Sequence, residues 1–125
     1  MKFLLLIGIA GFFGTILRYA CVRLINNWAT CFPFGTLIVN IIGSFLAGFF
    51  FIFCKSKLPQ FEAYFPLLFI GFLGAFTTFS TFALESTKFY LDAEYGKFII
   101  YVIVQNISGL LAAGLGIMLA KLITR

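Results

Sequence analysis

Hydroxyl and phenyl side chains alternate near the middle of the third hydrophobic stretch of this 125-residue chain. The block reads Thr-Thr-Phe-Ser-Thr-Phe over residues 77–82, and Gly71 and Gly74 come shortly before it. A hydroxyl is a neutral hydrogen-bond donor, and the edge of a phenyl ring is electropositive. Such groups could replace the water around a small anion without supplying a full positive charge. The alternative is that these rings are packed core, which is the commoner use of a phenylalanine stripe.

Asn40 is a second polar group that needs an explanation, because it lies in the middle of the second hydrophobic stretch. An amide that faces hydrocarbon is costly, so Asn40 must face protein or water. It could join two helices through a hydrogen bond, or it could donate its NH₂ group to a passing anion. The spacing alone leaves both interpretations open.

Three further groups follow helical spacing or lie near a span end. Tyr101, Gln105 and Ser108 fall at i, i+4 and i+7, which predicts a polar line that is either a hydrogen-bonding seam or a pore wall. Arg18 is the one cation that could lie inside a span, although snorkelling to the headgroups is the commoner role for such a residue. Glu85 continues the line of Thr78 and Thr81, but the acidic residues are too few for an embedded proton relay.

The residues needed for several other kinds of chemistry are missing from the sequence. It contains no histidine, and its three cysteines have no Cys-x-x-Cys spacing. A zinc site and a nucleophile–base pair are therefore not expected, and neither is enzyme activity. The net charge of +5 is spread over loops, so nucleic-acid binding has no support.

The composition predicts an all-α integral membrane protein. Of the residues, 62% are hydrophobic and 10% are charged, whereas roughly a quarter of the residues of soluble domains are charged. We expect one transmembrane domain over residues 1–125 with four spans, at about 3–26, 34–54, 62–91 and 98–120.

The third predicted span is longer than a bilayer requires at about 1.5 Å per residue. We therefore expect the third helix to be broken near its middle, around residues 74–78. An unwound segment at this depth is allowed only inside protein or a wet cavity, where its carbonyl groups could hold a cation and its N–H groups could attract an anion.

Lys and Arg residues are distributed almost evenly between the two sides of the membrane, with five on the side of the termini and four opposite. So small a bias permits insertion in both orientations, and hence an antiparallel homodimer. A small multidrug or proton-coupled exporter is an alternative class, but it would need an embedded acid in an early span, and the first two spans have none. A non-transporting assembly subunit is the other alternative.

Three blocks of residues resemble the signatures of one family, in the family's order. They are Gly11-x-x-Gly14-x-x-x-Arg18-Tyr19, then Pro33-Phe-Gly35-Thr36-Leu-Ile-Val-Asn40-x-x-Gly43-Ser44-Phe45, then Gly71-x-x-Gly74-x-x-Thr77-Thr78-Phe79-Ser80-Thr81-Phe82-x-x-Glu85. They resemble the Fluc/CrcB family of small fluoride channels, and the resemblance covers essentially the whole chain.

The resemblance implies a passive, fluoride-selective channel in the cell membrane of a prokaryote, which exports fluoride from the cytoplasm. It implies an antiparallel dual-topology homodimer with two pores and a structural sodium ion (Na⁺) at its centre, and no organic cofactor. Pairing with a second homologous chain stays open. The implied pore residues are Asn40, Phe79, Phe82, Ser80, Thr81, Tyr101 and Ser108, with Arg18 and Glu85 in a vestibule or pathway and with Gly74 and Thr77 holding sodium through their backbone carbonyls.

Overall fold

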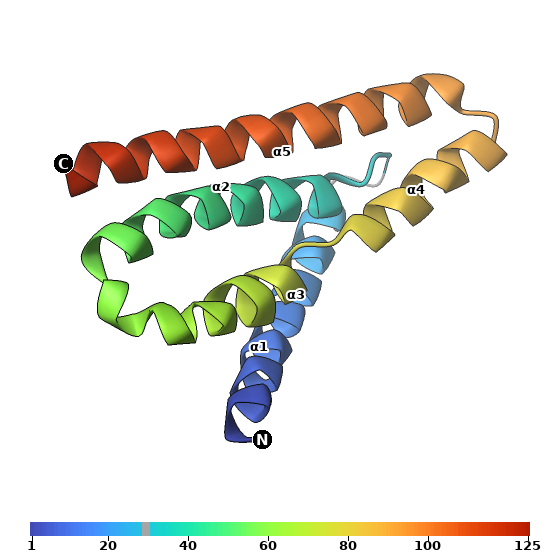
Figure 1. Cartoon of the computed structure of the whole chain (residues 1–125). Coiled ribbons are helices and arrows are strands. Elements are labelled where there is room, and N and C mark those ends of the chain that lie inside the picture. Colours follow the sequence, from blue (N-terminus) through green and yellow to red (C-terminus); the bar gives the residue numbers. More distant parts are fainter. Residues whose placement is uncertain (29–30) are drawn as a thin grey trace.

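The chain is built from helices throughout the part that the computed structural model describes, residues 1–28 and 31–125 (Figure 1). The elements are α1 (Lys2–Asn26), α2 (Phe34–Lys57), η1 (Pro59–Tyr64), η2 (Leu67–Leu73), α3 (Gly74–Phe76), α4 (Phe79–Leu91) and α5 (Tyr95–Thr124). Four stretches are long and apolar enough to cross a membrane, namely α1, α2, the combined stretch Pro59–Leu91, and α5. The prediction of an all-α membrane protein with four spans is confirmed.

The third span is a succession of short segments and not one straight helix. A π-helix over Leu67–Leu73 leads into one α-helical turn, Gly74–Phe76. The backbone then becomes extended at Thr77 (φ −85°, ψ 160°) and Thr78 (φ −151°, ψ 117°), and α4 begins at Phe79. Figure 1 shows this turn of the chain between α3 and α4. The expected break is present, and it lies at Thr77 and Thr78.

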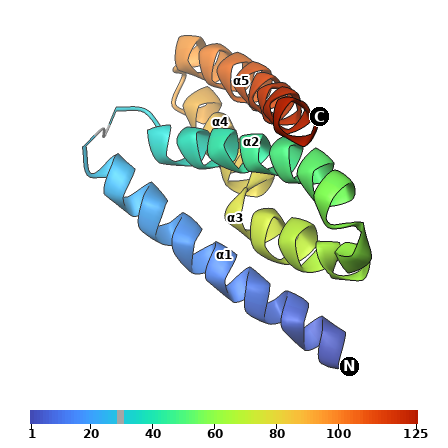
Figure 2. The same cartoon turned by 90° about the vertical axis from the view of Figure 1, so that its left-hand side faces the viewer.

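Helices α2 and α5 run side by side in the same direction (Figures 1 and 2), and glycines hold them close together. A Cβ atom added at Gly116 of α5 would collide with the backbone carbonyl oxygen of Phe45. A Cβ atom at Gly48 of α2 would collide with that of Ala113. Small residues let transmembrane backbones approach in this way, so this seam depends on the absence of side chains.

Helix α1 packs on the other side of the bundle, against η2, α3 and α2 (Figure 2). Gly14 is the one buried residue of α1, and a Cβ atom there would collide with the carbonyl oxygen of Phe72. Most of the helix is uncovered, and the side chains of Phe12 and Phe13 are 61% and 59% exposed. The single chain therefore leaves large apolar faces to lipid or to another protein.

We expect Gly116→Ala to destabilise the protein by about 1–3 kcal/mol, because the added methyl group overpacks the seam between α2 and α5. The matched control is Gly114→Ala on the same helix, where a Cβ atom meets nothing within 4 Å. Thermal unfolding of the purified variants in detergent measures the difference. Equal stabilities of the two variants would show that the seam is not tightly packed.

Candidate functional site

Asn40 of α2 holds the break in the third span through a pair of hydrogen bonds. Its Nδ2 atom donates to the backbone carbonyl of Thr78 over 2.9 Å, and its Oδ1 atom accepts from the Thr78 N–H over 2.8 Å. Both residues are buried. The amide thus replaces the Gly74 carbonyl to which the Thr78 N–H would donate in a continuous helix, and it adds a donor to the Thr78 carbonyl, which is the N-cap carbonyl of α4. One hydrogen of the Asn40 NH₂ group is left over, because this group carries two.

The side chain of Thr78 caps the start of α4. Its Oγ1 atom accepts a hydrogen bond from the backbone N–H of Thr81 over 3.2 Å, as N-cap threonines commonly do. It also lies 3.0 Å from the Thr81 Oγ1 atom and 3.3 Å from the Ser80 Oγ atom. The hydroxyl groups of the Thr-Thr-Phe-Ser-Thr-Phe block therefore gather at the amino end of α4, where the helix dipole is positive.

Because of these hydrogen bonds, two backbone N–H groups bond to side chains and not to the carbonyl groups they would reach in a continuous helix. In a continuous helix Thr78 would donate to Gly74 and Thr81 would donate to Thr77. Here the Thr78 N–H goes to Asn40, and the Thr81 N–H goes to the Thr78 side chain. The Thr77 carbonyl instead accepts a long hydrogen bond of 3.5 Å from Nη1 of Arg18. The carbonyls of Gly74 and Thr77, the predicted cation ligands, are thus among those that lose their helical donors at the break.

A groove of about 480 Å³ lies beside the break, and we call it the inner groove. It is lined by Asn40, Gly43, Ser44 and Ala47 of α2, by Phe69, Leu73, Gly74, Thr77, Thr78, Phe79 and Phe82 of the third span, and by Gln105, Asn106, Gly109, Leu110 and Ala113 of α5.

The two predicted pore rings take different places at the inner groove. The ring centres of Phe79 and Phe82 are 5.4 Å apart, and their planes meet at 63°. Phe82 is buried in the core of the chain, whereas Phe79 is 75% exposed. Phe82 therefore lines the inner groove from within the core of one chain, whereas most of the Phe79 ring is uncovered in the single chain.

Tyr101 and Glu85 form a second polar cluster, together with Thr36. The Thr36 hydroxyl donates to Oε1 of Glu85 over 2.9 Å, and the Tyr101 hydroxyl donates to Oε2 over 2.7 Å. The Tyr101 ring is fully buried, and it meets the ring of Phe82 at a centroid distance of 5.3 Å. Glu85 and Tyr101 thus lie behind the aromatic wall of the inner groove.

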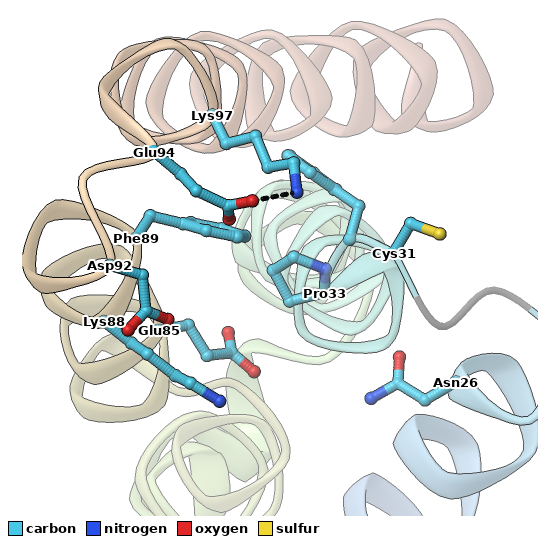
Figure 3. Close-up of a pocket in the computed structure, with 10 residues that line it drawn as sticks. Asn26, Cys31, Pro33, Glu85, Lys88, Phe89, Asp92, Glu94 and Lys97 are labelled. Atoms are coloured by element: carbon cyan, nitrogen blue, oxygen red, sulfur yellow. Dashed lines mark hydrogen bonds and ion pairs between the residues drawn. The ribbon is translucent and has the colours of Figure 1, made fainter.

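A second hollow, of about 570 Å³, opens on the other side of Glu85, and we call it the outer cavity (Figure 3). It is lined by Asn26, Cys31, Phe32, Pro33, Glu85, Lys88, Phe89, Asp92, Glu94 and Lys97. Lys97 forms an ion pair with Glu94 over 2.7 Å. The contacts from Glu85 to Tyr101 and on to Phe82 therefore connect the outer cavity with the inner groove.

The two serines predicted for the pore, Ser80 and Ser108, do not line the inner groove in the single chain. The Ser108 hydroxyl donates to the carbonyl of Val104 in its own helix over 2.6 Å. Ser80 is exposed at the start of α4, next to Thr78. Any contact of these serines with an ion therefore requires more than one chain or a rearrangement of Ser108.

Two residues that the site prediction omitted belong to the site. Thr36 contacts Glu85 through its hydroxyl, and Gln105 lines the inner groove. The sequence contains a signal for Gln105, since it follows Tyr101 by about one helical turn. Thr36 lies in the second signature block, but helical spacing does not indicate its partner, which is 49 residues away along the chain.

Comparison with known proteins gives the same family match over nearly the whole chain. Residues 5–117 match a family model described as "CrcB-like protein, Camphor Resistance (CrcB)". The chain is 42% identical over 118 residues to the fluoride-specific ion channel FluC of Legionella pneumophila (strain Paris), covering 94% of this chain and 88% of that protein. It is 41% identical over 119 residues to the protein of that name from Campylobacter lari, covering 94% and 97%.

Proposed function

This chain belongs to the CrcB family, and we propose that it forms a passive channel selective for fluoride. The observation that carries the proposal is its identity of 41–42% to relatives named fluoride-specific ion channels, over 94% of its length. The relatives are channels, so the expectation that the chain is not an enzyme is confirmed. Four apolar helices and bacterial relatives also make it a multi-pass membrane protein of a prokaryote.

The inner groove and its rim supply the kind of groups that a fluoride pathway needs. Fluoride is small and holds its water strongly, so a pore must offer close donors in place of that water. The spare N–H of Asn40 and the edge of the Phe82 ring are such groups in the groove, and the hydroxyls of Ser80 and Thr81 lie next to it at the start of α4. None carries a full positive charge, so each site binds weakly enough to release the ion.

The inner groove is open on one side in a single chain, which supports assembly as an antiparallel homodimer with two pores. Phe79 lines the groove yet is 75% exposed. A second copy in the opposite orientation would cover this ring and close the groove into a pathway, and two copies would give two such pathways. The nearly even distribution of Lys and Arg permits both orientations.

The groups beyond the aromatic rings suit a pathway to the membrane surface. Tyr101 and Glu85 lead from Phe82 to the outer cavity, and Arg18 lies near the break on the side of α1. Fluoride would move along this pathway down its own gradient. In an acidic environment fluoride enters a cell as its neutral weak acid, and the channel would then let the anion leave the cytoplasm.

A structural sodium ion fits the two released carbonyl groups of the break. Unwound backbone carbonyls hold Na⁺ in other membrane proteins, and oxygen is the ligand that suits this ion. Gly74 and Thr77 offer two such oxygens per chain, so two copies would offer four. When bound, the ion would offset the carbonyl dipoles where the two breaks meet. Arg18, through its contact with the Thr77 carbonyl, would hold that group in place.

The first experiment is ion efflux from liposomes that contain the purified protein. We expect rapid release of fluoride with release of chloride at least about a hundredfold slower, because the larger ion does not fit the donors. Exchange that requires a pH gradient would point to a proton-coupled exporter. No release of either ion would point to an assembly subunit and would remove the proposal.

Two substitutions test the pathway within the same efflux measurement. We expect Phe82→Ile to reduce fluoride release sharply, because it removes the electropositive ring edge. We expect the same of Asn40→Asp, since a carboxylate has no N–H to donate and repels an anion. Phe61→Ile, at an exposed ring of η1, is the matched control. Wild-type rates in both pathway variants would exclude this pathway.

The sodium proposal predicts that the purified dimer is more stable in sodium than in a large organic cation. Sodium at a concentration of about a hundred times its dissociation constant would stabilise the native state by about 2.7 kcal/mol. The thermal midpoint is measured in sodium chloride and in N-methylglucamine chloride at equal ionic strength. Equal midpoints in the two salts would contradict a structural sodium ion.

The dual-topology proposal can be tested with the exposed thiol of Cys31. Cys21 and Cys54 are first replaced by alanine, which leaves Cys31 as the one thiol in the chain. A membrane-impermeant maleimide should then label roughly half of the protein in intact cells, and the remainder only after the membrane is opened, because both orientations are present. Complete labelling, or none, in intact cells would show one fixed orientation.

A further inference from the structure

Helices α2 and α5 end at the same side of the bundle, because they run side by side in the same direction (Figures 1 and 2). A Cβ atom added at Gly109 would lie 3.6 Å from the Ser44 hydroxyl, and one added at Gly48 would meet the carbonyl oxygen of Ala113. The members of both pairs are 65 residues apart in the chain. The same offset therefore holds along the seam between the two helices.

This offset brings basic side chains of the two helix ends together. We call them the basic end, and they are Lys55 and Lys57 of α2, Lys121 of α5, and Arg125, which follows α5 directly. The offset puts Lys121 level with residue 56, which stands between the two lysines of α2. All four residues are exposed. Their positive charges thus form one patch although they come from distant parts of the sequence.

Acidic side chains are scarce at the basic end. The chain has four acidic residues. Glu85, Asp92 and Glu94 line the outer cavity, and Glu62 lies in η1, directly after α2. Within residues 1–28 and 31–125, the one ion pair joins Lys97 to Glu94. The cations of the basic end are therefore not neutralised by a carboxylate of their own chain.

Apolar surface adjoins this patch on both helices. Phe51 of α2 is exposed, as are Met118 and Leu122 of α5. The Lys55 ammonium lies 4.5 Å from the centre of the Phe51 ring, so charge and apolar surface meet at this residue. A phospholipid has the same two parts, since its headgroup is polar and its acyl chains are apolar.

We propose that the basic end binds the phosphodiester headgroup of an anionic phospholipid, whose acyl chains lie along the exposed apolar side chains of α2 and α5. Clusters of Lys and Arg next to a membrane span attract anionic lipids. Cations at a helix C-terminus also offset the helix dipole, but that effect acts within each helix and does not require the two sets of cations to lie side by side. The inference needs only the membrane-spanning fold, so it stands or falls independently of the fluoride channel proposed above.

The test is the selection of lipid by the purified protein. Wild type in detergent is mixed with equal amounts of phosphatidylglycerol and phosphatidylcholine that carry the same acyl chains. The protein is then purified again, and the retained lipids are quantified by mass spectrometry. We expect several-fold enrichment of phosphatidylglycerol, because its headgroup carries a net negative charge. Equal retention of the two lipids would overturn the proposal.

Paired variants locate the site. Lys57→Gln/Lys121→Gln should lose most of the enrichment, whereas Lys57→Arg/Lys121→Arg should keep it, since a guanidinium group also binds phosphate. The matched control is Lys88→Gln/Lys97→Gln, which removes the same charge beside the outer cavity and should behave as wild type. An equal loss in this control would show that net charge explains the enrichment, and would overturn the site.

A competitor distinguishes the lipid from a free phosphate. Glycerol phosphate has the phosphate group without acyl chains, and at a concentration equal to that of the lipid it should leave retention unchanged. Displacement of phosphatidylglycerol would assign the basic end to a free phosphate instead. Size-exclusion profiles are compared for all variants. If the double glutamine variant does not assemble, Lys57→Gln and Lys121→Gln are measured singly, and full enrichment in both would overturn the proposal.

Discussion

The structure depends on satisfying a broken backbone inside a membrane. No water is available in the hydrocarbon region to bind free N–H and C=O groups, so a break there is tolerated only where protein groups replace the lost partners. The Asn40 amide does this for the N–H of Thr78, and the Thr78 hydroxyl does it for the N–H of Thr81. Each replacement releases a carbonyl group one turn earlier. The same few bonds therefore fix the shape of the third span and leave the carbonyls of Gly74 and Thr77 without their helical donors.

The close seam between α2 and α5 follows from this constraint. Asn40 can reach the break only if α2 lies against the third span, and Gly43 makes room there, since a Cβ atom at that position would collide with the Thr77 side chain. At the seam between α2 and α5, Gly48 of α2 and Gly116 of α5 let the two backbones meet, and Tyr101 of α5 reaches the Glu85 carboxylate of α4. Glycine at these positions is thus a requirement of the site as much as of the fold.

The sequence predicted the membrane class, the four spans and the position of the break, because these follow from hydrophobicity, length and the placement of Gly74. It did not resolve which face of α5 meets the inner groove. Gln105 and Ala113 follow Tyr101 by four and twelve residues. A helical turn takes about 3.6 residues, so each step of four goes slightly past a full turn, and both residues lie on the same side of Tyr101 around the helix axis. Both line the inner groove. Ser108 follows Tyr101 by seven residues, which falls short of two turns, so it lies on the other side of the tyrosine. The spacing of polar residues predicts a stripe along the helix surface. The packing of the other helices then determines which edge of this stripe faces a neighbouring helix.

The cluster around Glu85 limits what Tyr101 can do for an anion. A phenol has one proton to donate, and that of Tyr101 is held by the Glu85 carboxylate over 2.7 Å. The Thr36 hydroxyl is held in the same way. Neither group can donate to fluoride while these bonds persist, so a path past Tyr101 must either use its ring edge or exchange the carboxylate for the anion. The Asn40 amide is not limited in this way, because it keeps one N–H after closing the break. Among Asn40, Tyr101 and Thr36, the one donor that stays available to an anion is therefore the Asn40 amide on the groove side of Phe82, since the other two bind the Glu85 carboxylate.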